Sequence, residues 1–235
     1  ENEPDVQSTV SEILADVKAR DDAAVIDHTR RLDKFDLTAE TMRFTSQEIV
    51  SAVENCNAEE VEALKLAAAR IMAFHEKQIP EDLRYTDDVG VELGYRWTAL
   101  EAVGLYVPGG TASYPSSVLM NAVPAKVAGV RRVVMVVPTP GGVINPLVLA
   151  AAHIAGIDEV YKIGGAQAVG ALAYGTETIT PVDKIVGPGN AYVAAAKRQV
   201  FGTVGIDMIA GPSEILVVAD GENDPKQIIL SIIND

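Results

Sequence analysis

The sequence has one cysteine and no long apolar run, and these two absences exclude several classes of protein. With Cys56 alone among 235 residues, no disulfide can form within the chain, which is typical of an intracellular protein. No stretch of eighteen or more apolar residues and no basic leader followed by an apolar segment is present. We therefore expect a soluble protein of the cytoplasm.

Positive charge is also scarce. The chain carries 19 Lys and Arg residues against 33 Asp and Glu residues, which gives a formal net charge of −14 and a pI of about 4.6. Such acidity excludes nucleic acid and an anionic membrane surface as probable partners. The hydrophobic fraction of 48% is sufficient for the core of one large domain or two small ones.

Glycine, proline and charge are unevenly distributed along the chain. Residues 1–100 have a net charge of −11 but hold only 2 of the 19 glycines, whereas residues 101–235 have a net charge of −3 and hold the other 17. This asymmetry predicts two parts. Residues 1–100 form an acidic, helical part that leads into a first α/β unit, and residues 101–235 form a glycine-rich α/β part.

The first part has helical periodicity over several segments. Apolar residues from Val6 to Val17 are spaced as one helix face, and three further helices are expected over 22–32, after Ser46, and from Ala58 to about 78. From residue 91 to 100, apolar residues alternate as in a strand. His28 and His75 lie in these helices without metal-ligand spacing, so we interpret them as surface residues.

The second part repeats a strand, a glycine turn and a helix. This repeated order of elements predicts an α/β fold built on a doubly wound parallel sheet. We expect the sheet to be Rossmann-like and its crossover connections to be right-handed. The expected strands are 102–107, 132–137, 159–163 and 184–186, and the expected helices are 116–129, 146–155, 166–174 and 191–200.

The glycine turns lack the two common nucleotide signatures. Neither G-x-G-x-x-G nor a P-loop is present. The turns at 109–110, 164–165 and 187–189 nevertheless can present backbone N–H groups to an anion at helix N-termini. Gln167 and Asn190 follow two of these turns, and their amides suit ribose hydroxyls or a carboxamide. Capping of the following helices is an equally open interpretation.

A fourth turn, AGPSE at 210–214, places Ser213 at the edge of a strand. By residue type alone this turn is more often structural than functional.

His153, in an alanine-rich helix, is more often a packed or surface residue than a ligand. The crevice that several such turns form at strand ends remains the candidate ligand site.

Four ordered blocks resemble histidinol dehydrogenases. These blocks are GLYVPGGTASYPSSVLMNAVPAKVAGV, KIGGAQAVGALAYGTETI, VDKIVGPGNAYVAAAKRQVFG and IDMIAGPSEILVVAD, and the resemblance covers most of residues 84–224. It implies a homodimeric enzyme that uses zinc and two NAD in succession to oxidise L-histidinol, through L-histidinaldehyde, to L-histidine. It also implies that Tyr106, Gln167 and Asn190 contact NAD and that Ser213 contacts the substrate.

The sequence departs from the family near its end. The family continues with a Gln-Ala-Glu-His stretch that supplies zinc ligands and with a later Glu-His pair that acts as acid and base; neither occurs in these 235 residues. Because the chain starts with Glu1 and Asp235 falls within an apparent element, we expect a piece of a longer protein. Truncation and a missing internal segment both remain open. We expect no catalytic or metal-binding residue in the chain, and no turnover by it alone.

Two other functions are compatible with some features of the sequence. An aldehyde dehydrogenase also has a non-standard dinucleotide crevice, but it needs a nucleophilic cysteine, and Cys56 lies in the helical first part. A non-catalytic dinucleotide-binding or assembly module keeps the fold without the chemistry. The sequence leaves this alternative open.

Overall fold

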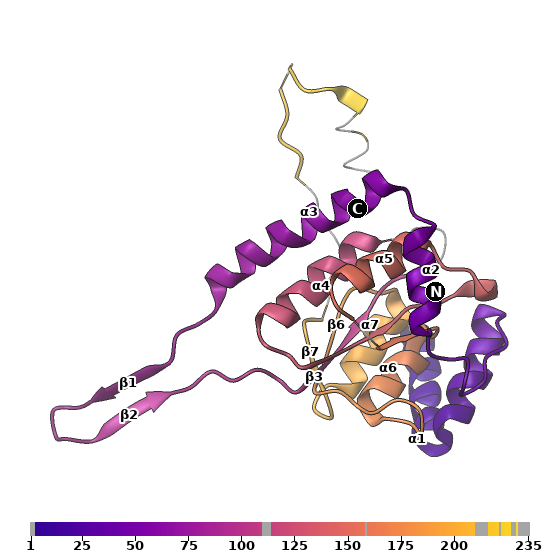
Figure 1. Ribbon diagram of the computed structural model, residues 1–235. Coiled ribbons are helices and arrows are strands. Elements are labelled where there is room, and N and C mark those ends of the chain that lie inside the picture. Colours follow the sequence, from indigo (N-terminus) through magenta and orange to yellow (C-terminus); the bar gives the residue numbers. More distant parts are fainter. Residues whose placement is uncertain are drawn as a thin grey trace.

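The fold is built around a parallel sheet of five strands (Figure 1). The computed structural model describes residues 3–109, 114–157, 159–209, 216–220, 222–226 and 229. The strand order is β5-β4-β3-β6-β7, and all four pairings are parallel. The strands are β3 (Ala102–Tyr106), β4 (Arg132–Val136), β5 (Glu159–Tyr161), β6 (Lys184–Val186) and β7 (Gly205–Ile206). An α/β fold with a parallel sheet is thus confirmed.

Both faces of the central strands are buried, which explains their continuous apolar sequences. Ala102 and Tyr106 of β3 belong to one hydrophobic cluster, and Val103 and Leu105 belong to the other. Residues of β4 alternate between the two clusters in the same way. At Gly104, a Cβ atom would lie 2.9 Å from a methyl group of Leu172, so the absent side chain lets α6 pack closely on β3.

Helices cover the two faces in two layers each. On one face α4 and α5 lie against each other, with α2 and α3 outside them, and on the other α6 and α7 are covered by α1 (Figure 1). The helices are α1 (Glu3–Asp33), α2 (Ser46–Glu54), α3 (Ala58–His75), α4 (Pro115–Val127), α5 (Pro146–Ile154), α6 (Gly165–Tyr174) and α7 (Ala191–Val200). Short 3-10 turns occupy Glu76–Gln78 and Pro140–Gly142.

Helix α1 consists of two halves that meet at Asp21, where φ is 52°. This break agrees with the two helices expected from the sequence. The apolar residues of the first half, from Val6 to Val17, are buried and share a cluster with α6, α7 and the sheet. Helices from the first hundred residues therefore contribute to the core of the α/β part, and the division near residue 100 stays a prediction.

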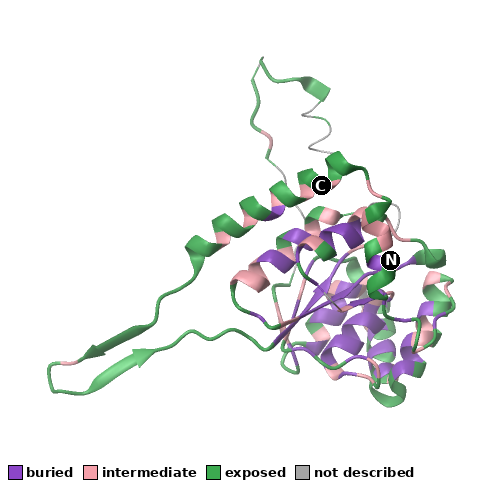
Figure 2. Ribbon diagram, viewed as in Figure 1, coloured by how far each residue is buried: buried purple, intermediate pink, exposed green. Residues whose placement is uncertain are grey.

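The expected strand over 91–100 is present but shorter than predicted. Only β2 (Glu92–Tyr95) is a strand, and it pairs antiparallel with β1 (Leu83–Thr86) rather than joining the main sheet. The hairpin projects away from the body of the molecule with all its strand residues exposed (Figure 2). Alternation along a strand indicates two different faces, but it does not identify which sheet the strand joins.

None of the helices in the described part of the chain is both long and apolar enough to span a membrane.

Candidate functional site

Three glycine turns meet at the carboxyl edge of the sheet. Tyr106 ends β3, Gly164 and Gly165 lie at the start of α6, and the turn 187–190 joins β6 to α7. The chain moves outward from β3 through β4 to β5 and then resumes on the other side of β3 with β6. In open parallel sheets, ligands bind where the strand order reverses in this way.

A cavity of about 360 Å³ opens at this edge, and its lining includes Tyr106, Gln167 and Asn190. These residues are far apart in sequence and come from three separate turns. The cavity also includes Asp33 from the end of α1, together with apolar side chains. Its volume lies in the range of small-molecule sites. The structure thus brings together all three residues for which the resemblance implies contact with NAD.

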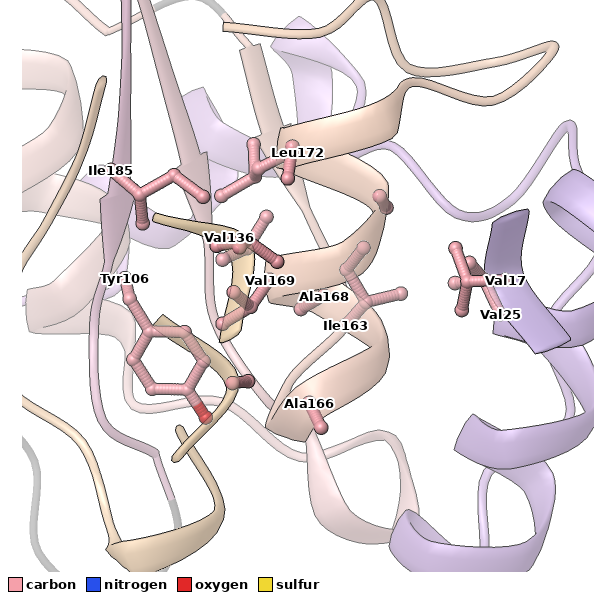
Figure 3. Close-up of a cluster of buried hydrophobic side chains, with 14 of the residues drawn as sticks. Val17, Val25, Tyr106, Val136, Ile163, Ala166, Ala168, Val169, Leu172 and Ile185 are labelled. Atoms are coloured by element: carbon pink, nitrogen blue, oxygen red, sulfur yellow. The ribbon is translucent and has the colours of Figure 1, made fainter. Parts of the chain in front are cut away.

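Tyr106 is held in place by a backbone hydrogen bond. Its hydroxyl oxygen accepts the N–H of Gly165 at 2.9 Å, while its ring lies in the buried cluster shared by β3 and α6 (Figure 3). Burial raises the pKa of Tyr106 to about 12; the Gly165 hydrogen bond opposes this shift and the charge of Asp33 adds to it. The phenol therefore remains protonated at neutral pH and keeps its O–H available as a donor.

Gln167 is the most deeply buried polar residue of the cavity. It is 1% exposed, and its Oε1 atom is buried without a hydrogen-bond partner in the described part of the structure. Helix α6 begins after Gly164 and has no side-chain cap, so the capping interpretation of Gln167 is wrong. An unpaired buried acceptor is unfavourable unless a ligand supplies a donor.

Asn190, by contrast, does cap its helix. Its Oδ1 atom accepts the N–H groups of Tyr192 and Val193, both at 3.1 Å, at the start of α7. The capping interpretation is therefore correct for Asn190. Because the cap uses the carboxamide oxygen, the Nδ2 amide is the group left to meet a ligand.

The turn after β6 is fixed from two sides by an ion pair between the buried Lys197 and the more exposed Asp207. The N–H of Gly187 donates to Asp207 at 2.9 Å, and the carbonyl of Gly187 accepts from Lys197 at 2.9 Å. Lys197 and Asp207 also pair with each other. The N–H groups of Gly165 and Gly187 were expected to face an anion, but both are bonded within the protein. The lysine of α7 was not identified from the sequence.

Asp33 was also not identified from the sequence. Its Oδ2 atom is buried without a partner among the described residues, and burial raises the pKa of its carboxyl group. Four buried side-chain atoms of the described part lack partners, and two of them, on Asp33 and Gln167, line this cavity. A third belongs to Thr139, which lies between two lining prolines. The acidic helix gave no signal that would separate Asp33 from its many neighbours.

A larger cavity of about 590 Å³ lies between α4, the 3-10 turn at Glu76–Gln78 and the segment 97–100, which joins β2 to β3. None of the buried unpartnered atoms of the described residues lines it. Two of its polar side chains already form hydrogen bonds within the protein. Asp82 accepts one from the backbone N–H of Trp97, and the His75 ring forms one with the side chain of Gln78. The smaller cavity is therefore the better candidate, because its polar groups still require a ligand.

Within the described residues, no group of three or more His, Cys, Asp or Glu side chains could hold a metal ion. His28 is not the surface residue that was expected, because its side chain is 11% exposed and its Nε2 lies 2.9 Å from Asp16. His75 is half-buried and His153 is exposed, and no such cluster among the described residues includes them. Ser213 lies outside the described residues.

Comparisons with known proteins agree on one family. The family model described as histidinol dehydrogenase matches residues 1–235. The chain is 67% identical to the histidinol dehydrogenase of Rhodospirillum rubrum and 64% identical to that of Ruegeria pomeroyi, in each case over 234 residues and 54% of the relative. The crystal structure of histidinol dehydrogenase from Elizabethkingia anophelis is similar with a TM-score of 0.89 at 39% identity. That match covers 97% of this chain and 53% of the crystallised one. The chain thus spans about half the length of these relatives.

Proposed function

Because the chain belongs to the histidinol dehydrogenase family, we propose that its cavity at the carboxyl edge of the sheet binds NAD. The observation that carries this proposal is the gathering of Tyr106, Gln167 and Asn190, from three separate turns, around one cavity. The strand order, with its reversal between β3 and β6, supports a Rossmann-like arrangement of this half of the protein.

The hydrogen-bonding groups of the cavity suit a dinucleotide. Gln167 and Asp33 contribute unpaired acceptors, and the Tyr106 hydroxyl and the Asn190 amide contribute donors. Ribose hydroxyls and the carboxamide of nicotinamide both donate and accept, so they can satisfy these groups together. When bound, NAD supplies the hydride acceptor, while the chain's own residues orient it and exclude water.

The activity of the whole protein follows from the family. We propose NAD- and zinc-dependent oxidation of L-histidinol, through L-histidinaldehyde, to L-histidine, by a cytoplasmic homodimer, with Ser213 in contact with the substrate. The described residues supply no metal cluster, so zinc would be held elsewhere in the protein. The residues described here hold and orient the cofactor, which is the part of the chemistry that they can perform.

A pair of glutamine variants tests the cavity assignment. Gln167→Leu removes the unpaired acceptor, whereas Gln78→Leu makes the same change in the larger cavity. We expect Gln167→Leu to weaken NAD binding by about 10-fold or more, since a buried hydrogen bond contributes roughly 1 to 2 kcal/mol. Isothermal titration calorimetry of the natural, whole protein with NAD measures this change.

Thermal unfolding of the same variants separates binding from folding. Gln167→Leu removes a buried polar atom that has no partner, so we expect the melting temperature without NAD to be unchanged or higher. Gln78→Leu should keep full affinity. Loss of NAD affinity in Gln78→Leu but not in Gln167→Leu would place the cofactor in the other cavity and refute the assignment.

The 235 residues taken alone are expected to give no turnover. In the family the zinc ligands and the acid and base lie in segments that this sequence does not contain, and their loss removes the chemical step while leaving the cofactor site. The measurement is NADH formation from L-histidinol by the purified chain, compared with the natural protein in the presence of zinc. Production of NADH by the chain alone contradicts the prediction. NAD binding without turnover by the natural protein would instead favour the non-catalytic module.

A further inference from the structure

We propose that Asp33 is the acceptor for the adenosine ribose hydroxyls of the cofactor and that it makes the site select NAD over NADP. This inference rests on the proposed NAD site and adds a specificity-determining residue to it. It is carried by an unpaired carboxylate oxygen that lines the same cavity as Tyr106, Gln167 and Asn190.

The position of Asp33 is unfavourable for the stability of the free protein. Its Oδ2 atom is buried and has no partner in the described part of the structure, which leaves a carboxylate poorly solvated. Asp33 is also the last residue of α1, where the helix dipole disfavours negative charge. Residues that break local rules in this way, without a compensating contact, are concentrated at functional sites.

The surroundings of Asp33 fit a nucleoside. Leu32, Pro138 and Pro140 line the same cavity and offer apolar surface to a flat base. A carboxylate accepts two hydrogen bonds from neighbouring hydroxyl groups, which is how many dinucleotide sites recognise an adenosine ribose. Asp33 lines the same cavity as Tyr106, and its charge contributes to the raised pKa of the buried phenol.

The same carboxylate disfavours NADP. NADP replaces the 2′-hydroxyl with a phosphate, which removes the donor and brings negative charge to a buried negative group. Arg31 also lines the cavity and could instead attract a phosphate, but its Nη2 atom lies 3.0 Å from Nδ1 of His28. Asp33 thus predicts a preference for NAD and Arg31 a preference for NADP, and binding measurements can distinguish the two.

Two asparagine variants near the end of α1 provide the test. Asp33→Asn changes the cavity carboxylate, and Asp36→Asn makes the same charge change three residues later, where the side chain is 85% exposed and pairs with Arg30. The dissociation constants of NAD and NADP are measured by calorimetry on the natural, whole protein. We expect Asp33→Asn to weaken NAD about 10-fold and to reduce the preference for NAD over NADP by a further factor of about 10. Asp36→Asn should change neither constant by more than about twofold.

The stability of Asp33→Asn shows whether the residue is structural. A functional Asp33 predicts an equal or higher melting temperature for the variant without ligand, because an unpaired buried charge has been removed. Unchanged affinities for both cofactors in Asp33→Asn overturn the proposal while leaving the NAD site intact. A natural protein that binds NADP at least as tightly as NAD also overturns it and points to Arg31. A natural protein that binds neither cofactor refutes the NAD site as well.

A modified cofactor tests the same contact on the natural protein if Asp33→Asn does not fold. NAD that lacks the adenosine 2′-hydroxyl should bind the natural protein about 10-fold more weakly than NAD, because the acceptor loses its donor. Equal binding of the two ligands overturns the proposal.

Discussion

Replacing Gly187 with alanine is expected to lower the free energy of unfolding by about 2 to 5 kcal/mol. The backbone of Gly187 has φ of 112°, a region that side chains rarely adopt, which costs about 1 to 2 kcal/mol. A Cβ atom there would also lie 2.1 Å from the carbonyl oxygen of Tyr106, so β3 and the turn after β6 would have to separate. Such overpacking adds roughly 1 to 3 kcal/mol. Urea unfolding of the two proteins measures the difference.

Gly202 offers a matched control for this substitution. Its φ is 102°, but a Cβ atom at this position would meet nothing within 4 Å. Gly202→Ala therefore introduces the backbone strain without the clash, and we expect a loss of about 1 to 2 kcal/mol. Equal losses in the two variants would show that the close approach between Gly187 and Tyr106 contributes nothing to stability.

The second large effect is expected at the ion pair of Lys197 and Asp207. Lys197→Met removes the cation and leaves the Asp207 carboxylate, whose side chain is 30% exposed, without its charged partner. It also leaves the carbonyl of Gly187 without the donor that now lies at 2.9 Å. Breaking a fully buried pair costs about 3 to 5 kcal/mol and breaking an exposed one less than about 1 kcal/mol. Because only the lysine of this pair is buried, we expect an intermediate loss of about 2 to 3 kcal/mol by urea unfolding.

Two further variants show whether this loss comes from the stranded carboxylate. Adding Asp207→Asn to Lys197→Met neutralises the carboxylate, so we expect part of the stability to return. Arg84→Met breaks the pair between Arg84 and Glu92, whose side chains are 77% and 60% exposed, and should cost less than about 1 kcal/mol. A loss of that small size in Lys197→Met would show that the pair of Lys197 and Asp207 contributes no more to stability than an exposed pair.

The pair also predicts how stability depends on pH. Burial alone raises the pKa of Asp207, but the hydrogen bonds from Lys197, Met208 and Gly187, with the charge of Lys197, outweigh it and hold the pKa below its usual value. A carboxyl group with a lowered folded pKa contributes stability that is complete above its unfolded pKa, at about pH 4, and is lost as the pH falls through the folded value. Acid unfolding should therefore begin at higher pH in Lys197→Met than in the natural protein.

Much of the α/β part could be predicted from local sequence. The helix 191–200 and the strand 184–186 were predicted with the bounds that the structure shows, because glycine turns and apolar runs mark their ends. The hairpin at 83–95 could not be predicted in the same way. Its alternating residues resemble a half-buried strand, yet all of its strand residues are exposed. The strands' partners, and not their own residues, decide which sheet they join.

The candidate site was also only partly visible in the sequence. The resemblance indicated Tyr106, Gln167 and Asn190, but the sequence left the capping question open, and the structure answers it oppositely for the two amides. Asp33 gave no signal, since it is one charged residue among many in α1. Lys197 gave none either, because nothing in the sequence distinguishes it from Arg198 beside it. The importance of Asp33 and Lys197 depends on burial and on which oxygen atoms lack partners, and neither property is local.

The sequence by itself determined the α/β class and the glycine turns, because these depend on periodicity and on residues that tolerate particular backbone conformations. The resemblance of four sequence blocks indicated the family. Only the tertiary structure decided that Tyr106 and Asn190, from two distant turns, share one cavity and that Asp33 of α1 lines it too. Parallel strands bring their carboxyl ends to one edge regardless of their distance along the chain. The site is therefore a property of the order in which the strands pair.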